Sequence, residues 1–88
     1  MTTAPSPIEL MRCEATHYEE TPDEVSGYWR GHYVWVERKD EDGLWYIRVN
    51  HPDGGYLYDG WWRAHRDVDA SDAVVEAFRG AELLEAGQ

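Results

Sequence analysis

The clearest pattern in the chain is an alternation of large apolar and polar side chains between residues 28 and 62. Two turn sequences at residues 40–43 and 52–55, both rich in Asp and Gly, divide this stretch into three runs rich in Val, Ile, Tyr and Trp. Runs of period two separated by such turns are typical of antiparallel strands joined by hairpins. We therefore expect a meander of three strands, with the core of the sheet at residues 28–66.

The first hairpin has a register that gathers its apolar positions. If Lys39 and Leu44 flank the turn, one face becomes the natural core face, because side chains alternate with period two. This face carries Val34, Val36, Trp45, Ile47 and Val49. The opposite face carries Tyr33, Trp35, Glu37, Leu44, Tyr46 and Arg48. Three large aromatic rings are unusual on a face that meets water, so either another element covers this face or it binds something.

The second hairpin allows two arrangements, because residues 52–55 fit a four-residue loop or a type I turn followed by a glycine bulge. In the first arrangement Tyr58 and Trp62 face the core. In the second, Leu57 and Trp61 do. The two choices therefore reverse which aromatic side chains stay outside.

We favour the first arrangement because it places Asp59 opposite Arg48. Gly60 is then predicted to mark a second bulge or a point of close approach. The surrounding sequence, residues 59–63, has two interpretations: its tryptophans fill the core of a small domain, or they form an aromatic hot spot for a partner.

The N-terminal third gives weaker signals. Ser6, Pro7 and Glu9 form a good helix opening, with a cap, a proline at the first position and a glutamate that can reach back to the cap. Residues 10–18 lack a helical stripe and favour an edge strand, after at most one helical turn at residues 6–10. We expect residues 1–7 to be flexible and residues 19–27 to form a loop or a short turn.

The C-terminal segment, residues 69–85, predicts a helix that packs on the sheet. Asp69 or Ser71 can cap it, and Gly80 and Gly87 are possible stops. Its apolar positions recur at helical spacing, and they are Ala70, Val74, Ala77, Phe78, Ala81 and Leu84. The expected fold class is α+β, an antiparallel sheet of three to four strands packed against one C-terminal helix, in a single small domain of residues 1–88.

Charge is distributed unevenly along the 88 residues. The formal net charge is −10 at pH 7, from 18 acidic and 8 basic side chains. Residues 1–27 and 67–88 each hold six acids and one base, whereas residues 28–66 hold six of each. Such acidity disfavours bare nucleic acid and anionic membranes as partners and favours a basic protein surface. Its simpler interpretation is that acidic segments only keep the protein soluble.

Few residues are candidates for chemistry. The chain has one cysteine, Cys13, so it forms no internal disulfide, and together with the lack of a signal peptide this predicts a cytoplasmic protein. Cys13 and His17 are spaced like two metal ligands, but a structural zinc site needs four. No motif of a catalytic nucleophile is present. We expect no metal, no cofactor and no enzymatic activity.

In size and acidity the chain resembles small inhibitors encoded by phages and mobile elements, including anti-CRISPR proteins that act as nucleic-acid mimics. The resemblance implies an inhibitor that binds the basic surface of a partner, such as a nucleic-acid-binding complex, and blocks it. The residues expected to contact the partner are Tyr33, Trp35, Tyr46, Arg48 and Trp61 on the sheet, Glu19, Glu20, Asp23 and Glu24 before it, and Asp72, Glu76 and Glu82 on the outer face of the helix. The alternative is a homodimer or small-ligand domain that uses the aromatic face, with acidity only for solubility.

Overall fold

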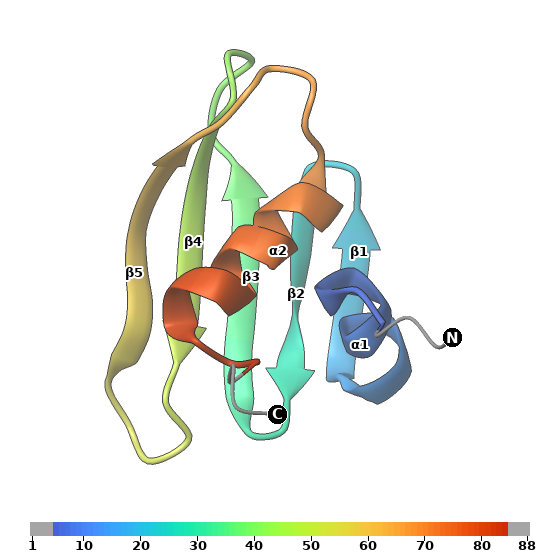
Figure 1. The fold of residues 1–88 in the computed structure, drawn as a ribbon, viewed down its shortest axis with the longest axis vertical. Helices are drawn as coiled ribbons and strands as arrows, with labels where there is room; N and C mark the ends of the chain where they lie inside the picture. Colours follow the sequence, from blue (N-terminus) through green and yellow to red (C-terminus); the bar gives the residue numbers. More distant parts are fainter. Residues whose placement is uncertain (1–4, 85–88) are drawn as a thin grey trace.

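The structure is a computed structural model that describes residues 5–84, and it contains one antiparallel sheet and two helices (Figure 1). In chain order the elements are α1 (Pro7–Glu14), β1 (Thr16–Thr21), β2 (Glu24–Trp29), β3 (His32–Arg38), β4 (Leu44–Asn50), β5 (Tyr56–Arg63) and α2 (Ala70–Ala81). Each strand lies beside its neighbours in sequence, so the sheet is a five-stranded meander. The predicted α+β class is confirmed, but the sheet has five strands where three to four were expected.

Strands β3, β4 and β5 follow the predicted hairpins. Val36 lies opposite Ile47, as the register of the first hairpin requires. Arg48 lies opposite Asp59, which confirms the register of the first arrangement considered for the second hairpin, although Asn50 pairs with Tyr56, so the regular four-residue loop is not formed. The irregularity of this hairpin falls between Val49 and Asn50, next to the turn.

The N-terminal segment differs from its prediction. Ser6 and Glu9 form the expected capping box, but the helix continues to Glu14, and the strand begins only at Thr16. Ile8 and Met11 are buried on one side of α1. With only two turns, this stripe is too short to be recognised as a helical period. Residues 1–4 of the segment expected to be flexible lie outside the described residues, whereas Ser6 and Pro7 belong to the start of α1.

Strands β1 and β2 occupy most of the segment predicted as a loop at residues 19–27. Only Pro22 and Asp23 separate them, so the turn is tight. Gly27, taken as a turn residue, is a buried strand position, where an added Cβ would lie 3.3 Å from the Cβ of Ala15 and 3.2 Å from the Tyr18 ring. The absence of a side chain at Gly27 lets Ala15 and Tyr18 pack closely against β2. Because glycine is also common in turns, this strand was predicted as a turn.

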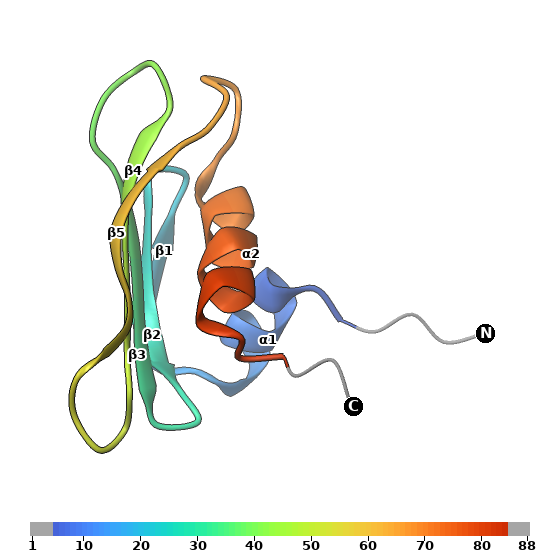
Figure 2. The ribbon, with the colours of Figure 1, turned by 60° about the vertical axis from the view of Figure 1, so that its left-hand side comes forward.

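Both helices lie on the same side of the sheet, which Figure 2 shows from its edge. The core fills the space between the helices and the sheet. It consists of Ile8, Met11, Val25, Trp29, Val34, Val36, Trp45, Ile47, Val49, Ala70, Ala73, Val74, Ala77, Phe78 and Ala81. The predicted core positions of the first hairpin are all among these residues. Within residues 5–84, no helix covers the other face of the sheet (Figures 1 and 2).

Helix α2 is shorter than predicted. Asp69 caps it, as expected, and its capping box is closed by Asp72. The helix ends at Ala81 because Glu82 takes a left-handed conformation, so Leu84 leaves the stripe and is 48% exposed. Gly87, the later stop that was considered, lies outside the described residues.

The predicted role of Gly60 is wrong. It pairs regularly with Ile47, and an added Cβ would have open space around it, so it marks neither a bulge nor a close approach. The close approach is at Gly80 of α2, where an added Cβ would lie 2.5 Å from Cδ2 of Tyr58 and closer still to Cε2. Gly80 is therefore a packing residue that seats α2 against β5.

Candidate functional site

The uncovered side of the sheet, here called the open face, carries an ordered array of side chains. One row crosses all five strands: Glu19, Ser26, Trp35, Arg48 and Asp59 are successive partners from β1 to β5. Carboxylates therefore stand at both ends of the row, with an indole and a guanidinium between them. Beside this row lie His17, Glu24, Tyr28, Tyr33, Glu37, Leu44, Tyr46, Tyr56, Trp61 and Arg63.

Aromatic rings connect across the open face. Tyr28 and Tyr33 have ring centroids 5.0 Å apart. Tyr46 meets Trp35 on one side at 5.3 Å and Trp61 on the other at 5.4 Å, both edge-on, which is a favourable geometry for aromatic pairs. Trp61 is nonetheless 62% exposed and Tyr28 is 46% exposed. The rings thus support one another while keeping much of their surface accessible.

Arg48 lies at the centre of this array. Its Cζ is 5.6 Å from the Trp35 ring, 5.8 Å from the Tyr46 ring and 5.2 Å from the Tyr56 ring. Arg48 thus has three aromatic neighbours. The Tyr46 hydroxyl donates a hydrogen bond to Asp59, and this bond raises the pKa of the phenol. These contacts hold the middle of the face in one arrangement.

A hollow of about 500 Å³ opens on the face beside this centre. Its lining consists of His17, Glu19, Glu24, Ser26, Tyr28, Tyr33, Trp35 and Arg48. His17 reaches it from an irregular part of β1, where its φ of 54° is unusual for a residue other than glycine. Its ring meets the Tyr28 ring at 5.9 Å. The bulge in β1 thus turns the histidine toward the open face, as bulges commonly do near binding sites.

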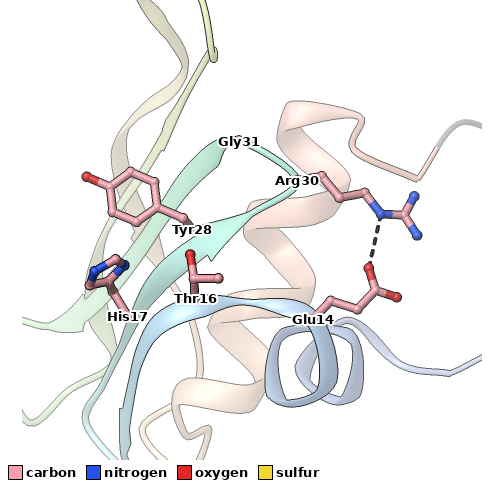
Figure 3. A pocket seen from close by; sticks show the side chains of 6 residues that line it. All are labelled: Glu14, Thr16, His17, Tyr28, Arg30 and Gly31. Carbon is pink, nitrogen blue, oxygen red and sulfur yellow. Dashed lines mark hydrogen bonds and ion pairs between the residues drawn. The ribbon is translucent and has the colours of Figure 1, made fainter.

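A second hollow, of about 690 Å³, lies at the adjoining end of the sheet. Figure 3 shows His17 and Tyr28 together on one side of it and the Arg30–Glu14 ion pair on the other. The Nε of Arg30 is 3.0 Å from the Glu14 carboxylate. Arg30 and Glu14 neutralise each other in this second hollow. The first hollow is therefore the better candidate for binding a charged group.

The acids expected before the sheet divide between two surfaces. Glu19 and Glu24 lie on the open face, and Glu24 accepts a 2.9 Å hydrogen bond from Nε1 of Trp35. Glu20 lies on the helix side, where Arg12 and Tyr18 donate to its carboxylate and lower its pKa to about 2.

Asp23 is used within the fold. Its carboxylate accepts a 2.8 Å hydrogen bond from Nε of Arg38. The guanidinium of Arg38 also donates to the carbonyl of Val68 and lies 4.7 Å above the Trp45 ring. This arrangement ties the β1–β2 turn to the segment before α2, while the Asp23 side chain stays 69% exposed.

The acids of α2 lie on the other side of the sheet from the open face. Glu76 is not solvent-exposed as predicted: its side chain is only 11% exposed, and it accepts hydrogen bonds from Tyr58 and Arg79. Burial and this bond raise the pKa of Tyr58 to about 12. Asp72 and Glu82 are exposed. One flat interface therefore cannot include both α2 and the aromatic residues.

The structure brings together all five sheet residues expected to bind: Tyr33, Trp35, Tyr46, Arg48 and Trp61. It adds three residues that sequence reasoning did not select, namely His17, Tyr28 and Tyr56. The signal for Tyr28 was the alternation of Val25, Gly27 and Trp29, which become buried, with polar neighbours. His17 depends on a bulge, for which the sequence carries no clear signal.

Within residues 5–84, no group of three or more His, Cys, Asp or Glu side chains is placed to hold a metal ion. Nor does either described helix have the length and apolar character needed to cross a membrane. No protein family model, curated protein or solved structure matches this chain. Its function is inferred from the geometry of the open face.

Proposed function

We propose that this chain is a non-enzymatic interaction protein that binds a basic surface of a partner protein through the open face. The observation that supports this most is the connected, accessible aromatic array on the side of the sheet that no described helix covers. Contiguous exposed aromatic surface commonly marks interaction sites. Trp, Tyr and Arg, which make up most of this array, are the residues that dominate binding energy at interfaces.

The charges around the array favour a basic partner. Glu19, Glu24, Glu37 and Asp59 lie on the open face, and the acids of α2 add to the same overall field. Complementary charge speeds association and selects partners, while packing of the aromatic residues sets the dissociation rate. A protein groove that holds DNA or RNA is a surface of the required kind. Occupation of such a groove by this chain would inhibit its normal binding.

A second copy of the chain fits the open face less well. Stacking two open faces would bring together two molecules that each carry a net charge of −10. Like charges that approach closely at an interface cost several kcal/mol, on the order of 2–5. The charge pattern therefore favours a different protein as partner.

The proposal is tested by capture from a bacterial lysate at increasing salt concentration, with mass spectrometry of what is retained. We expect a nucleic-acid-binding protein or complex whose capture weakens steeply as salt rises. Trp61→Ala is expected to abolish capture, because it removes the most exposed ring of the array. The matched control is Val75→Ala, which truncates an exposed apolar side chain on α2.

Two outcomes would contradict the proposal. One is capture that Trp61→Ala leaves unchanged and Val75→Ala removes, which would place the partner on the helix side. The other is the absence of any captured protein together with a dimer in sedimentation that does not respond to salt. This second result would favour self-association through the aromatic face.

A further inference from the structure

We infer that the hollow beside Trp35 is a subsite for one arginine side chain of the partner. The inference rests on the proposed function and specifies its chemistry. The hollow is formed by residues of β1, β2 and β3 together with Arg48 of β4, on the β1 side of the open face. Its volume of about 500 Å³ is ample for a guanidinium group with its aliphatic stem.

The walls of the hollow suit a flat cation. Tyr28 and Tyr33 contact each other with centroids 5.0 Å apart, and Tyr28 remains 46% exposed. Trp35 adds an indole ring to the same lining. Aromatic ring faces attract cations, and arginine uses them more often than lysine because its planar group also stacks.

Two carboxylates stand at the rim. Glu24 uses one oxygen, Oε2, to accept the 2.9 Å hydrogen bond from Trp35, which fixes the carboxylate beside the rings. Its other carboxylate oxygen forms no hydrogen bond within the described residues, and the Glu19 side chain forms none either. Because guanidinium presents several donors in one plane, it can bond both carboxylates while it stacks on a ring.

The open face already holds one guanidinium in this manner. Arg48 lies within 5.2–5.8 Å of three aromatic rings and donates a 3.2 Å hydrogen bond to the Tyr46 hydroxyl. The hollow offers the same kinds of aromatic ring, and its lining sets two carboxylates against the single positive charge of Arg48. The acidic and arginine side chains that line the hollow thus carry a net negative charge, which an arginine of the partner would neutralise.

The test is an NMR titration of the full chain with an acetylated and amidated Gly-Gly-Arg-Gly-Gly peptide. The same peptide with citrulline in place of arginine is the control, since citrulline has nearly the same shape and no charge. The indole Nε1–H signal of Trp35 is the reporter, because its bond to Glu24 lies at the rim of the hollow. We expect a saturable shift of this signal with the arginine peptide and little shift with the citrulline peptide.

A paired variant separates the subsite from general acidity. Glu19→Gln combined with Glu24→Gln removes two charges and keeps a hydrogen-bond acceptor for Trp35, and we expect it to weaken arginine-peptide binding about fivefold or more. Glu41→Gln combined with Glu82→Gln removes the same charge from exposed positions outside the hollow. This control is expected to change binding by less than about twofold.

Three results would overturn the subsite. They are equal shifts with the citrulline peptide, equal weakening by the two double variants, or no shift of the Trp35 signal. If arginine-peptide shifts appear only around Trp61, the subsite is wrong while the proposed binding face stands. Failure of the proposed function is seen separately, as partner capture that Trp61→Ala leaves unchanged.

Discussion

Gly80→Ala is expected to destabilise the protein, although replacing a glycine within a helix by alanine normally stabilises it. Alanine is favoured over glycine in helix interiors by about 1 kcal/mol. At Gly80, however, the new Cβ would lie 2.5 Å from Cδ2 of Tyr58. Real Cβ contacts are not this short, so the ring or the helix must move.

The size of the expected stability loss depends on how firmly the Tyr58 ring is held in place. Its hydroxyl donates a 2.9 Å hydrogen bond to Glu76, which is itself paired with Arg79. Overpacking of a fixed ring costs about 1–3 kcal/mol, and losing the hydrogen bond would add about 1 kcal/mol. After subtraction of the helix preference, we expect a net loss of about 1–3 kcal/mol in the free energy of unfolding.

Urea unfolding followed by tryptophan fluorescence measures this loss as a lower midpoint at unchanged slope. The control is Gly80→Ala in a Tyr58→Ala background, where the ring is gone and the substitution should stabilise the protein by up to about 1 kcal/mol. A midpoint that rises in both backgrounds would mean that α2 does not pack on Tyr58. The assignment of the covered face would then need revision.

Three further predictions concern stability, pH and binding. Gly43→Ala should cost about 2 kcal/mol or more in urea unfolding, because Gly43 has a φ of 97° and its added Cβ would lie 2.8 Å from the His65 carbonyl oxygen; a near-neutral effect would contradict this. The pKa of Glu20 is lowered from 4.5 to about 2, so its stabilising effect is complete above about pH 4.5 and is lost as the pH falls toward 2. Because its partner Arg12 is half exposed, the difference in unfolding free energy between wild type and Glu20→Gln should be at most about 1 kcal/mol at pH 7 and vanish only below about pH 2, and a difference that grows on acidification would be inconsistent with the pair. Trp35→Ala should lower partner affinity more than it lowers folding stability, as measured by titration and urea unfolding; equal losses would show that Trp35 serves the fold alone.

The parts of the fold that the sequence predicted are those where local pattern and tertiary packing agree. Val36 and Ile47 face each other because only one register collects the apolar positions of their hairpin. Arg48 and Asp59 face each other as the favoured register of the second hairpin requires, and the Tyr46 hydroxyl joins their side chains by hydrogen bonds. The stripe from Ala70 to Ala81 is long enough to show its period.

The parts that were missed depend on contacts between distant segments. Helix α1 has two turns, and its burial of Met11 is seen only once α2 is in place. Strand β2 was hidden by Gly27, whose role is to let Tyr18 approach. The pairing of Glu76 with Tyr58 also joins residues that no local pattern relates.

The candidate site shows the same division. Alternation placed Tyr46 on the open face, and the favoured arrangement of the second hairpin placed Trp61 there; strand pairing confirms both. His17 was missed because it reaches the open face through the bulge in β1, and Tyr28 was missed because most of β2 was expected to be a loop. Whether an acidic side chain is free or paired was also beyond prediction, since it depends on where Arg12 and Arg38 lie in the folded protein.

The most direct test of the binding face compares two substitutions with the captured partner in purified form. Isothermal titration would give the affinity of Trp61→Ala, on the open face, and of Glu82→Gln, on the helix side. We expect Trp61→Ala to weaken binding about 30-fold or more, as for a hot-spot residue, and Glu82→Gln to change it less than about twofold. The reverse order, with Glu82→Gln the damaging change, would contradict binding through the open face.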